Sequence, residues 1–449
     1  MLLLKNCRYV ATFDDENHEF QGYDILIDGN VIKRISKNID SNIAQKIDCS
    51  KHLVIPGLVN THHHFFQILT RNLRGAQNLK LFDWLVYHYP IWKKIDEEAI
   101  YYSTKLALVE LLKTGATTVS DHHYLHPVGV NSDIMEIQVG VAKELGVRFA
   151  PTRGSMTMGV KQGGLPPEEV VEPDAIVIKD MQDVIEKFHD PSPFSMTRVI
   201  LAPCSPFNVT LDLMRETVKI ARSYGVFMHT HLAETLDEQD YCLNKYGKRP
   251  LALMEELDWL GQDVFFAHGI WFNDEEMKLL KETRTGIAHC PSSNMRLGSG
   301  IARIREMLDM GIRVGLAVDG SASNDSSDML GEVRNAMLLQ RVKYGPTGLT
   351  AREALRIATR GGADILGFEK VGQIKEGFAA DITLFNLEKL QHAGSLSDPV
   401  ASIIFTGYNH EVDYSIINGK IVVENGKVKG VDEEELTHQV NKIANELLS

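Results

Sequence analysis

One stretch of this chain is far more informative than the rest, and it reads Leu53-Val54-Ile55-Pro56-Gly57-Leu58-Val59-Asn60-Thr61-His62-His63-His64. Side chains alternate between the two faces of a β-strand, so we expect His62 and His64 to point the same way and His63 to point the opposite way. Two imidazoles about 7 Å apart along a strand can close on one metal ion, and imidazole is the commonest metal ligand. An H-x-H pair also fits a polar strand end, so the rest of the chain must decide.

Length and composition set the class of protein. A chain of 449 residues exceeds an ordinary single domain, and its 44% hydrophobic and 24% charged residues are typical of a soluble globular protein. The formal net charge of −13 disfavours a nucleic-acid partner, because nothing resembles the basic surface that binds phosphates. Small neutral compounds, nucleobases included, remain possible substrates.

Neither the cysteines nor the N-terminus suggests export from the cell. The five cysteines are scattered and odd in number, which does not indicate a disulfide framework. The first residues, Met1-Leu2-Leu3-Leu4-Lys5, hold too few apolar side chains before a charge to form the core of a signal peptide. No apolar run reaches transmembrane length. The sequence therefore predicts a cytoplasmic enzyme with no membrane partner.

Both ends of the chain are rich in short strand-like runs. Hairpin signals occur at Asp28-Gly29-Asn30 near the start and at Asn418-Gly419 near the end. We expect residues 1–56 and 366–430 to meet in one small antiparallel β-sandwich domain. A closing helix is expected over residues 431–449.

The middle of the chain, residues 57–365, alternates short apolar strands with amphipathic helical stretches. Two such helical stretches are 97–114 and 211–224, and each is followed by a strand-like run. Alternation over about 300 residues indicates a parallel sheet, and this length suits a (β/α)8 TIM barrel better than an open sheet. The sequence therefore predicts an α/β fold in which the barrel is the metal-dependent catalytic domain.

Several of these strand-like runs end in residues that can bind a metal or transfer protons. Catalytic residues of such barrels lie at the carboxyl ends of the strands. Besides the first histidines, the later runs lead to His229, His231, Glu234, His268, His289 and Asp319. Any single one fits a solvated strand end, but so many in succession, at the spacing of αβ units, indicate one shared site.

These residues and their order resemble the amidohydrolase superfamily, in the branch of cytosine, guanine and adenosine-type deaminases and chlorohydrolases. The similarity covers nearly the whole chain and includes the signatures at 57–62 and 372–381. It implies one divalent metal ion with four ligands, namely His62, His64, His231 and Asp319. The catalytic residues would then be Glu234, which shuttles protons, His268, which polarises the attacking water, and the ligand Asp319. Relatives are commonly homo-oligomers, so we expect a dimer or a larger assembly.

The predicted ligands limit which metal ions the site can bind. Three imidazoles and one carboxylate suit Zn2+, which we expect first, and also accept Fe2+ or Mn2+. Such a site leaves room for a water whose pKa falls towards ~7. Superfamily members with two metals usually carry a lysine on the fourth strand, and the matching stretch here, residues 198–206, has none. We therefore expect a single metal ion.

The carboxylate of Glu234 indicates which leaving group the enzyme displaces. An amino group leaves only with a proton, which one carboxylate can take from water and deliver to the nitrogen. Relatives that displace chloride need no such proton. The sequence therefore predicts hydrolytic loss of ammonia or an amine from a small heterocycle. The alternative, a non-catalytic scaffold on the same fold, would not need the complete set of ligands and catalytic residues.

The substrate is predicted to be a flat free base. Relatives that deaminate nucleosides hold the ribose with an acidic residue after a Pro-Ile pair, whereas Pro90-Ile91 is followed here by Trp92. Several segments, among them 62–67 and 153–156, resemble members of the branch that deaminate 8-oxoguanine, isocytosine and isoxanthopterin. We expect 8-oxoguanine to be converted into urate and ammonia, with guanine, isocytosine, a pterin or an s-triazine amine as alternatives.

Four residues are candidates for contacts with this base. Gln67 offers a donor and an acceptor, and Arg153 offers a fork of donors suited to carbonyl oxygens. Trp84 or Trp92 is expected to stack on the ring. A packing role is the alternative for each. No ligand position is left for His122 and His123, so we expect them in polar supporting roles. His229 is offset from its ligand neighbour His231 and is expected to project into the pocket only if the strand is irregular there.

Overall fold

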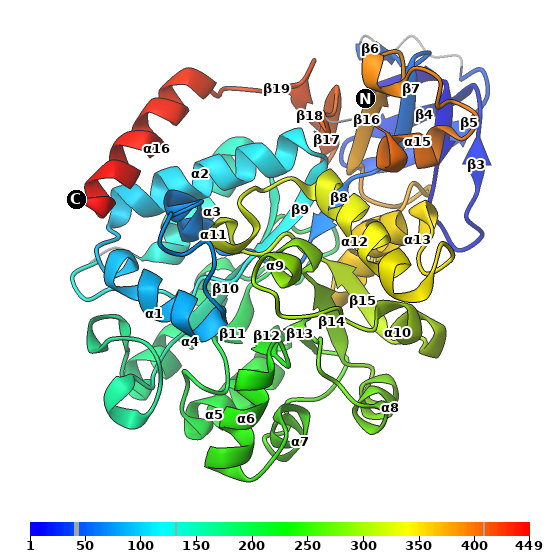
Figure 1. The fold of residues 1–449 in the computed structure, drawn as a ribbon. Coiled ribbons are helices and arrows are strands. Elements are labelled where there is room, and N and C mark those ends of the chain that lie inside the picture. Colours follow the sequence, from blue (N-terminus) through cyan, green and yellow to red (C-terminus); the bar gives the residue numbers. More distant parts are fainter. Residues whose placement is uncertain (40–44, 131–132, 407–408) are drawn as a thin grey trace.

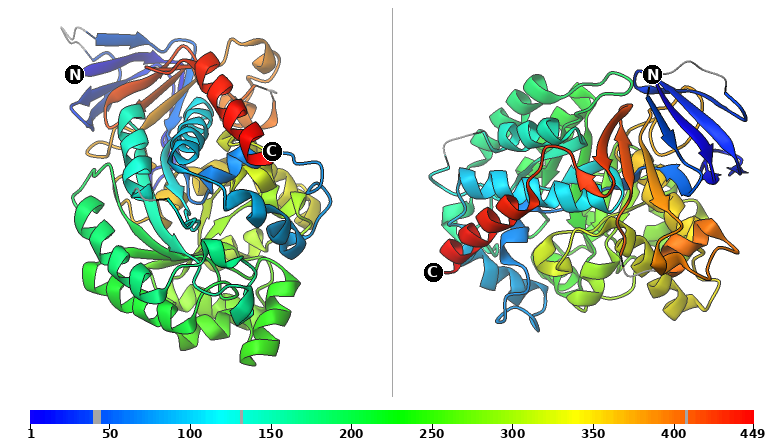
Figure 2. Two further views of the ribbon diagram at one scale, coloured as in Figure 1. Left: turned by 90° about the vertical axis from the view of Figure 1, so that its left-hand side faces the viewer. Right: turned by 90° about the horizontal axis from the view of Figure 1, so that it is seen from above.

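The structure is a computed structural model that describes residues 1–39, 45–130, 133–406 and 409–449. It consists of a closed barrel of parallel strands and, beside the barrel, two further β-sheets, one built from N-terminal strands and one built from both ends of the chain (Figure 1). The two turned views show the N-terminal strands next to the strands that precede the C-terminal helix (Figure 2). The predicted (β/α)8 barrel with an additional β domain is confirmed.

Eight parallel strands form the barrel. Their bounds are β8 Leu58–Asn60, β9 Ala116–Asp121, β10 Arg148–Ser155, β11 Ile200–Pro203, β12 Phe227–Leu232, β13 Val264–His268, β14 Gly286–His289 and β15 Arg313–Leu316. Each strand pairs with the next along the chain, and β15 closes the ring by pairing with β8, where Leu316 lies opposite Asn60. All carboxyl ends therefore meet at one mouth of the barrel.

The apolar run at residues 53–59 is two strands rather than one. β7 (His52–Pro56) belongs to a sheet beside the barrel, whereas β8 belongs to the barrel. The chain changes sheet at Gly57, where a Cβ atom would lie 2.0 Å from Thr117 Oγ1. A side chain at this position would push the first barrel strand away from β9, so the close approach depends on glycine.

Two sheets lie beside the barrel and share an apolar core that includes Leu4, Ile25, Val54 and Ile382. The smaller sheet has the order β5 (Val31–Ser36), β4 (Tyr23–Asp28), β1 (Leu2–Cys7) and β6 (Gln45–Asp48). The larger sheet has the order β19 (Lys427–Val428), β18 (Lys420–Glu424), β17 (Tyr414–Ile417), β16 (Ile382–Asn386), β7, β2 (Tyr9–Ala11) and β3 (Glu19–Phe20). The prediction of an antiparallel domain is wrong at two pairs, because β1 runs parallel to β6 and β2 parallel to β7.

Helices surround the barrel and connect its strands (Figure 1). Their bounds are α1 Leu81–Trp92, α2 Glu97–Lys113, α3 Ile134–Leu145, α4 Asp174–Phe188, α5 Leu211–Tyr224, α6 Leu236–Tyr246, α7 Pro250–Glu256, α8 Asp274–Thr283, α9 Pro291–Arg296, α10 Ile304–Met310, α11 Ser321–Asn324, α12 Met329–Tyr344, α13 Ala351–Arg356, α14 Gly362–Ile365, α15 Pro399–Phe405 and α16 Glu433–Leu448. The C-terminal helix α16 lies along α2 on the outside of the barrel.

Local sequence signals explain where these helices start and stop. The side chain of Thr210 accepts a hydrogen bond from Leu213 N at the start of α5, and Gly225 ends that helix with φ +69°. Asp432 caps α16 in the same way, by accepting from Glu434 N and Glu435 N. The helices predicted at 97–114, 211–224 and 431–449 are therefore present with boundaries shifted by at most two residues.

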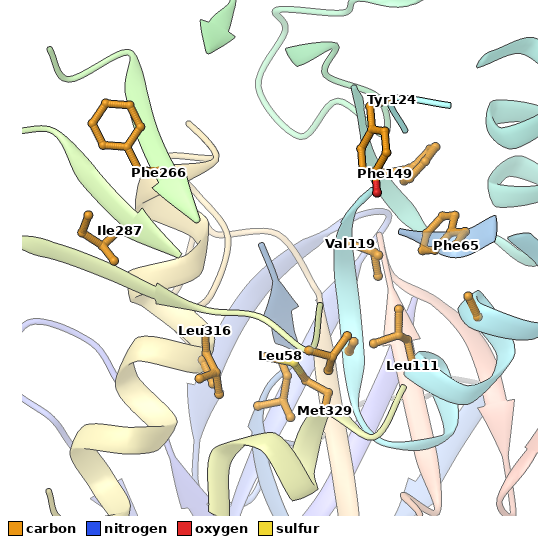
Figure 3. Close-up of a cluster of buried hydrophobic side chains, with 14 of the residues drawn as sticks. Leu58, Phe65, Leu111, Val119, Tyr124, Phe149, Phe266, Ile287, Leu316 and Met329 are labelled. Carbon is orange, nitrogen blue, oxygen red and sulfur yellow. The ribbon is translucent and has the colours of Figure 1, made fainter. Parts of the chain in front are cut away.

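The main apolar core fills the space between the barrel strands and the helices. Figure 3 shows part of this core, with Leu58, Leu316 and Met329 close together and Phe266 near Ile287 on two neighbouring strands. Burial of these side chains between the strands and the helices stabilises the positions of the barrel strands. The polar residues at the carboxyl ends are thereby carried on a rigid frame.

Two further features concern the molecule as a whole. All five cysteines are free and buried. No helix in the described part of the chain combines the length and the apolar character needed to cross a membrane.

The contact at Gly57 gives a first testable prediction. Gly57→Ala should lower the free energy of unfolding by about 1–3 kcal/mol, because its methyl group has no space against Thr117. Gly140→Ala is the matched control, since a Cβ there meets no atom within 4 Å on the exposed face of α3. The control should gain up to about 1 kcal/mol from helix propensity. Denaturant unfolding measures both, and equal stabilities of the two variants would contradict the close approach.

Candidate metal centre and active site

The four residues predicted to bind a metal lie together at the mouth of the barrel, where His62, His64 and Asp319 are buried and His231 is partly buried. β8 ends at Asn60, so His62 and His64 extend just beyond the hydrogen-bonded strand. The Nε2 atoms of His64 and His231 lie 3.1 Å apart. Asp319 Oδ1 lies 3.4 Å from the Nε2 atoms of both His62 and His64. Two overlapping clusters hold potential ligand atoms that all lie within 4.8 Å of one another, His62 with His64, His122 and His231, and His62 with His268 and Asp319. Such convergence of donor atoms is the geometry that a metal ion requires.

Hydrogen bonds to main-chain carbonyls fix the tautomers of two of these imidazoles. His64 Nδ1 lies 2.7 Å from the carbonyl oxygen of His122, and His231 Nδ1 lies 2.7 Å from that of Cys204. A carbonyl oxygen can only accept, so Nδ1 carries the proton in each ring. The Nε2 atoms of His64 and His231 are therefore bare and face each other.

The tautomer of His62, with its proton on Nδ1 and no proton on Nε2, is fixed by a second histidine. His229 Nδ1 lies 3.1 Å from the carbonyl oxygen of Phe265, so that nitrogen carries the proton and Nε2 of His229 can accept. His62 Nδ1 donates to this Nε2 at 2.7 Å. His62 Nε2 is left bare, and it is buried without a hydrogen-bond partner among the described residues. His229 is thus the residue that orients His62.

These residues fit a divalent metal ion. Burial lowers the pKa values of His62, His64 and His231, so all three rings are neutral at pH 7. Buried bare nitrogens that face one another without a proton between them need a cation to satisfy them. Imidazole nitrogens and a carboxylate oxygen are the donor types that hold catalytic zinc, so these residues would fit such an ion.

Two further groups face this cluster from neighbouring strands. His268 Nδ1 donates to Asn294 Oδ1 at 2.9 Å, which turns His268 Nε2 towards Glu234 Oε2 at 3.4 Å. Burial raises the pKa of Glu234 to about 7, against the opposing charge of His268. The pKa of His268 is raised, because the carboxylates of Glu234 and Asp319 outweigh the effect of burial. A carboxyl group that titrates near pH 7 can both accept and deliver a proton.

A small cavity lies directly over these groups. Its lining includes His64, His231, Glu234, His268 and Asp319 on the metal side. The lining also includes Gln67, Trp84, Tyr124 and Asn208. Gln67 Nε2 lies 3.4 Å from the hydroxyl oxygen of Tyr124, whereas Gln67 Oε1 has no partner among the described residues. The indole N–H of Trp84 is also buried and has no hydrogen-bond partner among the described residues.

Trp92 is not part of this cavity. Its indole is fully buried behind Trp84, with ring centroids 5.5 Å apart, and its N–H donates to Thr70 Oγ1 at 3.0 Å. Trp84 and Trp92 lie two turns apart on the inner face of α1, and only the first reaches the mouth of the barrel. The prediction that Trp92 stacks on a substrate is therefore wrong.

Arg153 is also outside the cavity, contrary to the prediction. Its guanidinium binds the carboxylate of Glu172 at 2.8 Å and 3.1 Å and also pairs with Asp180 on α4. Side chains alternate along β10, and this one points outward towards the helices. A fork of donors that is already bound to two carboxylates cannot read a substrate in the central cavity.

The remaining histidines have supporting positions. His122 acts through its carbonyl group, which receives the proton of His64 Nδ1. Its own Nε2 lies 2.8 Å from the carbonyl oxygen of Ala202. His123 follows β9, and its Nε2 lies 2.7 Å from the carbonyl oxygen of Leu125. Asn294, the partner of His268 Nδ1, lies 26 positions after it on α9, in a segment (290–294) that resembles a family loop shaping the pocket, but its bond to His268 was not predicted.

The barrel, its buried His/Asp cluster and the carboxyl group beside it define a metal-dependent hydrolase. Residues 53–422 match the sequence model of the Amidohydrolase family, and the chain belongs to this family. It is 43% identical to the 8-oxoguanine deaminase of Pseudomonas aeruginosa over 425 residues, which cover 94% of each protein. It is 35% identical to an isoxanthopterin deaminase of an unknown prokaryotic organism over 452 residues, 97% of this chain and 94% of that protein.

Solved structures agree with this assignment. The zinc complex of atrazine chlorohydrolase from Arthrobacter aurescens has a TM-score of 0.95 at 32% identity, covering 99% of this chain and 100% of that one. The chain is therefore an enzyme that hydrolyses carbon–nitrogen bonds of heterocyclic bases.

The bond between His62 and His229 gives a prediction about metal affinity. His229→Leu should weaken Zn2+ binding by about 10–100-fold, because His62 loses the acceptor that fixes its tautomer. His392→Leu is the control, since His392 is buried beside α15, away from the barrel mouth. Competition with a coloured chelator on metal-depleted protein measures both affinities. An unchanged affinity of the His229 variant would contradict the orienting role.

Proposed function

We propose that this enzyme deaminates 8-oxoguanine hydrolytically, giving urate and ammonia. The observation that carries the proposal is the buried carboxyl group of Glu234, 3.4 Å from His268 and beside the predicted metal ligands. A proton-delivering group at this point is what an amino leaving group requires. The choice of base is supported by 43% identity to an 8-oxoguanine deaminase across nearly the whole chain, against 35% for the isoxanthopterin deaminase.

A divalent ion, with Zn2+ as our first choice and Fe2+ or Mn2+ as alternatives, would lower the pKa of a water to about 7 and so supply a nucleophile at neutral pH. We propose that His62, His64, His231 and Asp319 hold one such ion. The donor set supports this choice, because its imidazoles are neutral and its carboxylate is hard and anionic.

In the proposed reaction, the water oxygen attacks the ring carbon that carries the amino group. A carbon–oxygen bond forms and an electron pair moves onto the ring nitrogen. Glu234 accepts a proton from the water and delivers it to the amino nitrogen. The electron pair on the ring nitrogen then re-forms the double bond to the ring carbon as the carbon–nitrogen bond to the amino group breaks, and ammonia leaves with the bonding pair. His268 lies 3.4 Å from Glu234 and 3.9 Å from Asp319, where it can donate a hydrogen bond to the attacking oxygen.

Gln67 and Trp84 are the residues that we propose to contact the base. The free Oε1 of Gln67 suits a ring N–H, and the free N–H of Trp84 suits a carbonyl oxygen of the ligand. Gly320 leaves room for this amide, because a Cβ atom there would lie 2.0 Å from Gln67 Oε1. A lactam ring such as that of 8-oxoguanine carries both kinds of group.

A pterin such as isoxanthopterin is the second candidate, supported by the 35% identical relative. It shares the amino-oxo pyrimidine ring with 8-oxoguanine, so the same edge contacts apply. Guanine, isocytosine and s-triazine amines remain further alternatives, and a scaffold without activity is disfavoured. The cytoplasmic location and the homo-oligomeric state stay predictions.

An ammonia-release assay tests the function directly. We expect zinc-loaded enzyme to release ammonia from 8-oxoguanine faster than from guanine, isocytosine, isoxanthopterin or an amino-s-triazine. Glu234→Gln should lower kcat by about 100–10,000-fold at equal zinc content, because the amide cannot shuttle the proton. Faster turnover of guanine than of 8-oxoguanine would overturn the substrate, and full activity of the Glu234 variant would overturn the proton route.

The amide of Gln67 gives a separate prediction about specificity. Gln67→Leu should lower kcat/KM for 8-oxoguanine by about 5–150-fold, the effect of a lost hydrogen bond worth about 1–3 kcal/mol. Gln340→Leu is the matched control, because that buried amide is bound by Arg305 N and by the carbonyl oxygen of Ala302, away from the cavity. Steady-state kinetics at matched folded concentration compares them. Equal losses in both variants would mean that Gln67 only packs.

A further inference from the structure

The proposed proton carrier Glu234 sits on an unusual turn between β12 and α6. Ala233, the residue before it, has φ +54°, a conformation that a non-glycine residue rarely adopts. Such backbone strain persists only where surrounding interactions hold it, and it often marks functional positions. The turn at Ala233 therefore needs a group that holds its backbone in place.

The side chain of Glu238 holds it. Glu238 Oε1 accepts from Ala233 N at 2.9 Å, and Glu238 Oε2 accepts from Glu234 N at 2.9 Å. The carboxylate is completely buried. Two successive main-chain N–H groups that converge in this way form an anion-binding concavity. Each oxygen of Glu238 therefore fixes one peptide group of the turn.

This arrangement differs from an ordinary helix cap. In α8 and α13, the glutamate at the third helical position reaches back to the N–H of the capping residue, Glu276 to Asn273 at 2.8 Å and Glu353 to Thr350 at 2.9 Å. In α6, Thr235 Oγ1 accepts from Glu238 N at 3.3 Å as in those caps. The carboxylate of Glu238, however, passes the capping residue and binds the two residues before it.

The same turn is also tied to His268. The carbonyl oxygen of Ala233 accepts from Ile270 N at 2.9 Å and from Trp271 N at 3.0 Å. These residues follow His268, which itself has φ +72°. Movement of the Ala233 peptide would therefore shift Glu234 and the loop beyond His268 together.

We propose that Glu238 is a positioning residue, which holds Glu234 at the place where it delivers its proton to the leaving nitrogen. The inference rests on the proposed proton route through Glu234. A glutamine at 238 keeps one acceptor but turns an NH2 group towards a main-chain N–H, so one of the two bonds is lost. Small displacements of a proton carrier reduce the rate far more than they reduce binding.

Leaving-group dependence separates positioning from mere stability. Ammonia leaves only with a proton, whereas chloride leaves without one. The experiment compares kcat for 8-oxoguanine with kcat for its 2-chloro analogue, in zinc-loaded wild type and in variants of equal zinc content. Glu238→Gln should lower the amine-to-chloride ratio by about 10–100-fold, with KM little changed. Glu276→Gln, the matched cap glutamate on α8, should lower thermal stability and leave this ratio unchanged.

Glu234→Gln is the reference arm of the same experiment. If its ratio does not fall, the proposed proton route fails, whatever Glu238 does. If the ratio falls for Glu234→Gln but not for Glu238→Gln, the positioning role alone is overturned, even when both rates drop with stability. Glu238→Asp keeps two acceptor oxygens on a shorter stem and is used if the glutamine variant does not fold. An unchanged ratio in Glu238→Asp then overturns the proposal.

Discussion

The placement of single protons on imidazole rings is the constraint on which this active site depends. His64 and His231 donate through Nδ1 to carbonyl oxygens of His122 and Cys204, and His62 donates to His229. With the opposite tautomer, an N–H would point into the cluster and exclude a cation. The carbonyl acceptors His122 and Cys204 directly follow β9 and β11, and the acceptor His229 lies within β12. The register of the closed barrel therefore sets the chemistry of the site, because a slip of one strand would remove an acceptor.

Backbone strain at the strand ends is the second condition. His268 has φ +72° and Asp319 has φ +68°, although neither is glycine. Each such residue costs about 1–3 kcal/mol, which the rest of the fold must offset. Asp319 N donates to the carbonyl oxygen of His62, and the side chain of Asn324 donates to that of Val318 on the same turn. Local hydrogen bonds and the rigid core together keep these side chains pointed at one place.

The elements that could be predicted from the sequence are those marked by local, recurring patterns of residues. Strand-end histidines, the helix at 211–224 and the barrel itself follow from alternation and capping, which are local properties. The positions of Arg153 and Trp92 relative to the cavity could not be predicted. Which side chains of β10 point into the barrel, and which residues of α1 extend to its mouth, depends on packing across the barrel. Asn294 and Glu238 were missed for another reason. Their partners are a distant ring and two main-chain N–H groups, which leave no mark in a pattern of side chains.

Reaction and substrate are encoded in different parts of this molecule. A chlorohydrolase and this chain superpose with a TM-score of 0.95, so the barrel does not decide between chloride and ammonia as the leaving group. The proposed proton carrier stands on a strand-end turn, whereas Gln67 and Trp84 come from the segment between β8 and α2. A buried acceptor and a buried donor without partners each cost about 1–3 kcal/mol. In the proposed binding mode, a ligand that satisfies both would gain this energy while an apolar ring would not, so a polar lactam edge would be favoured.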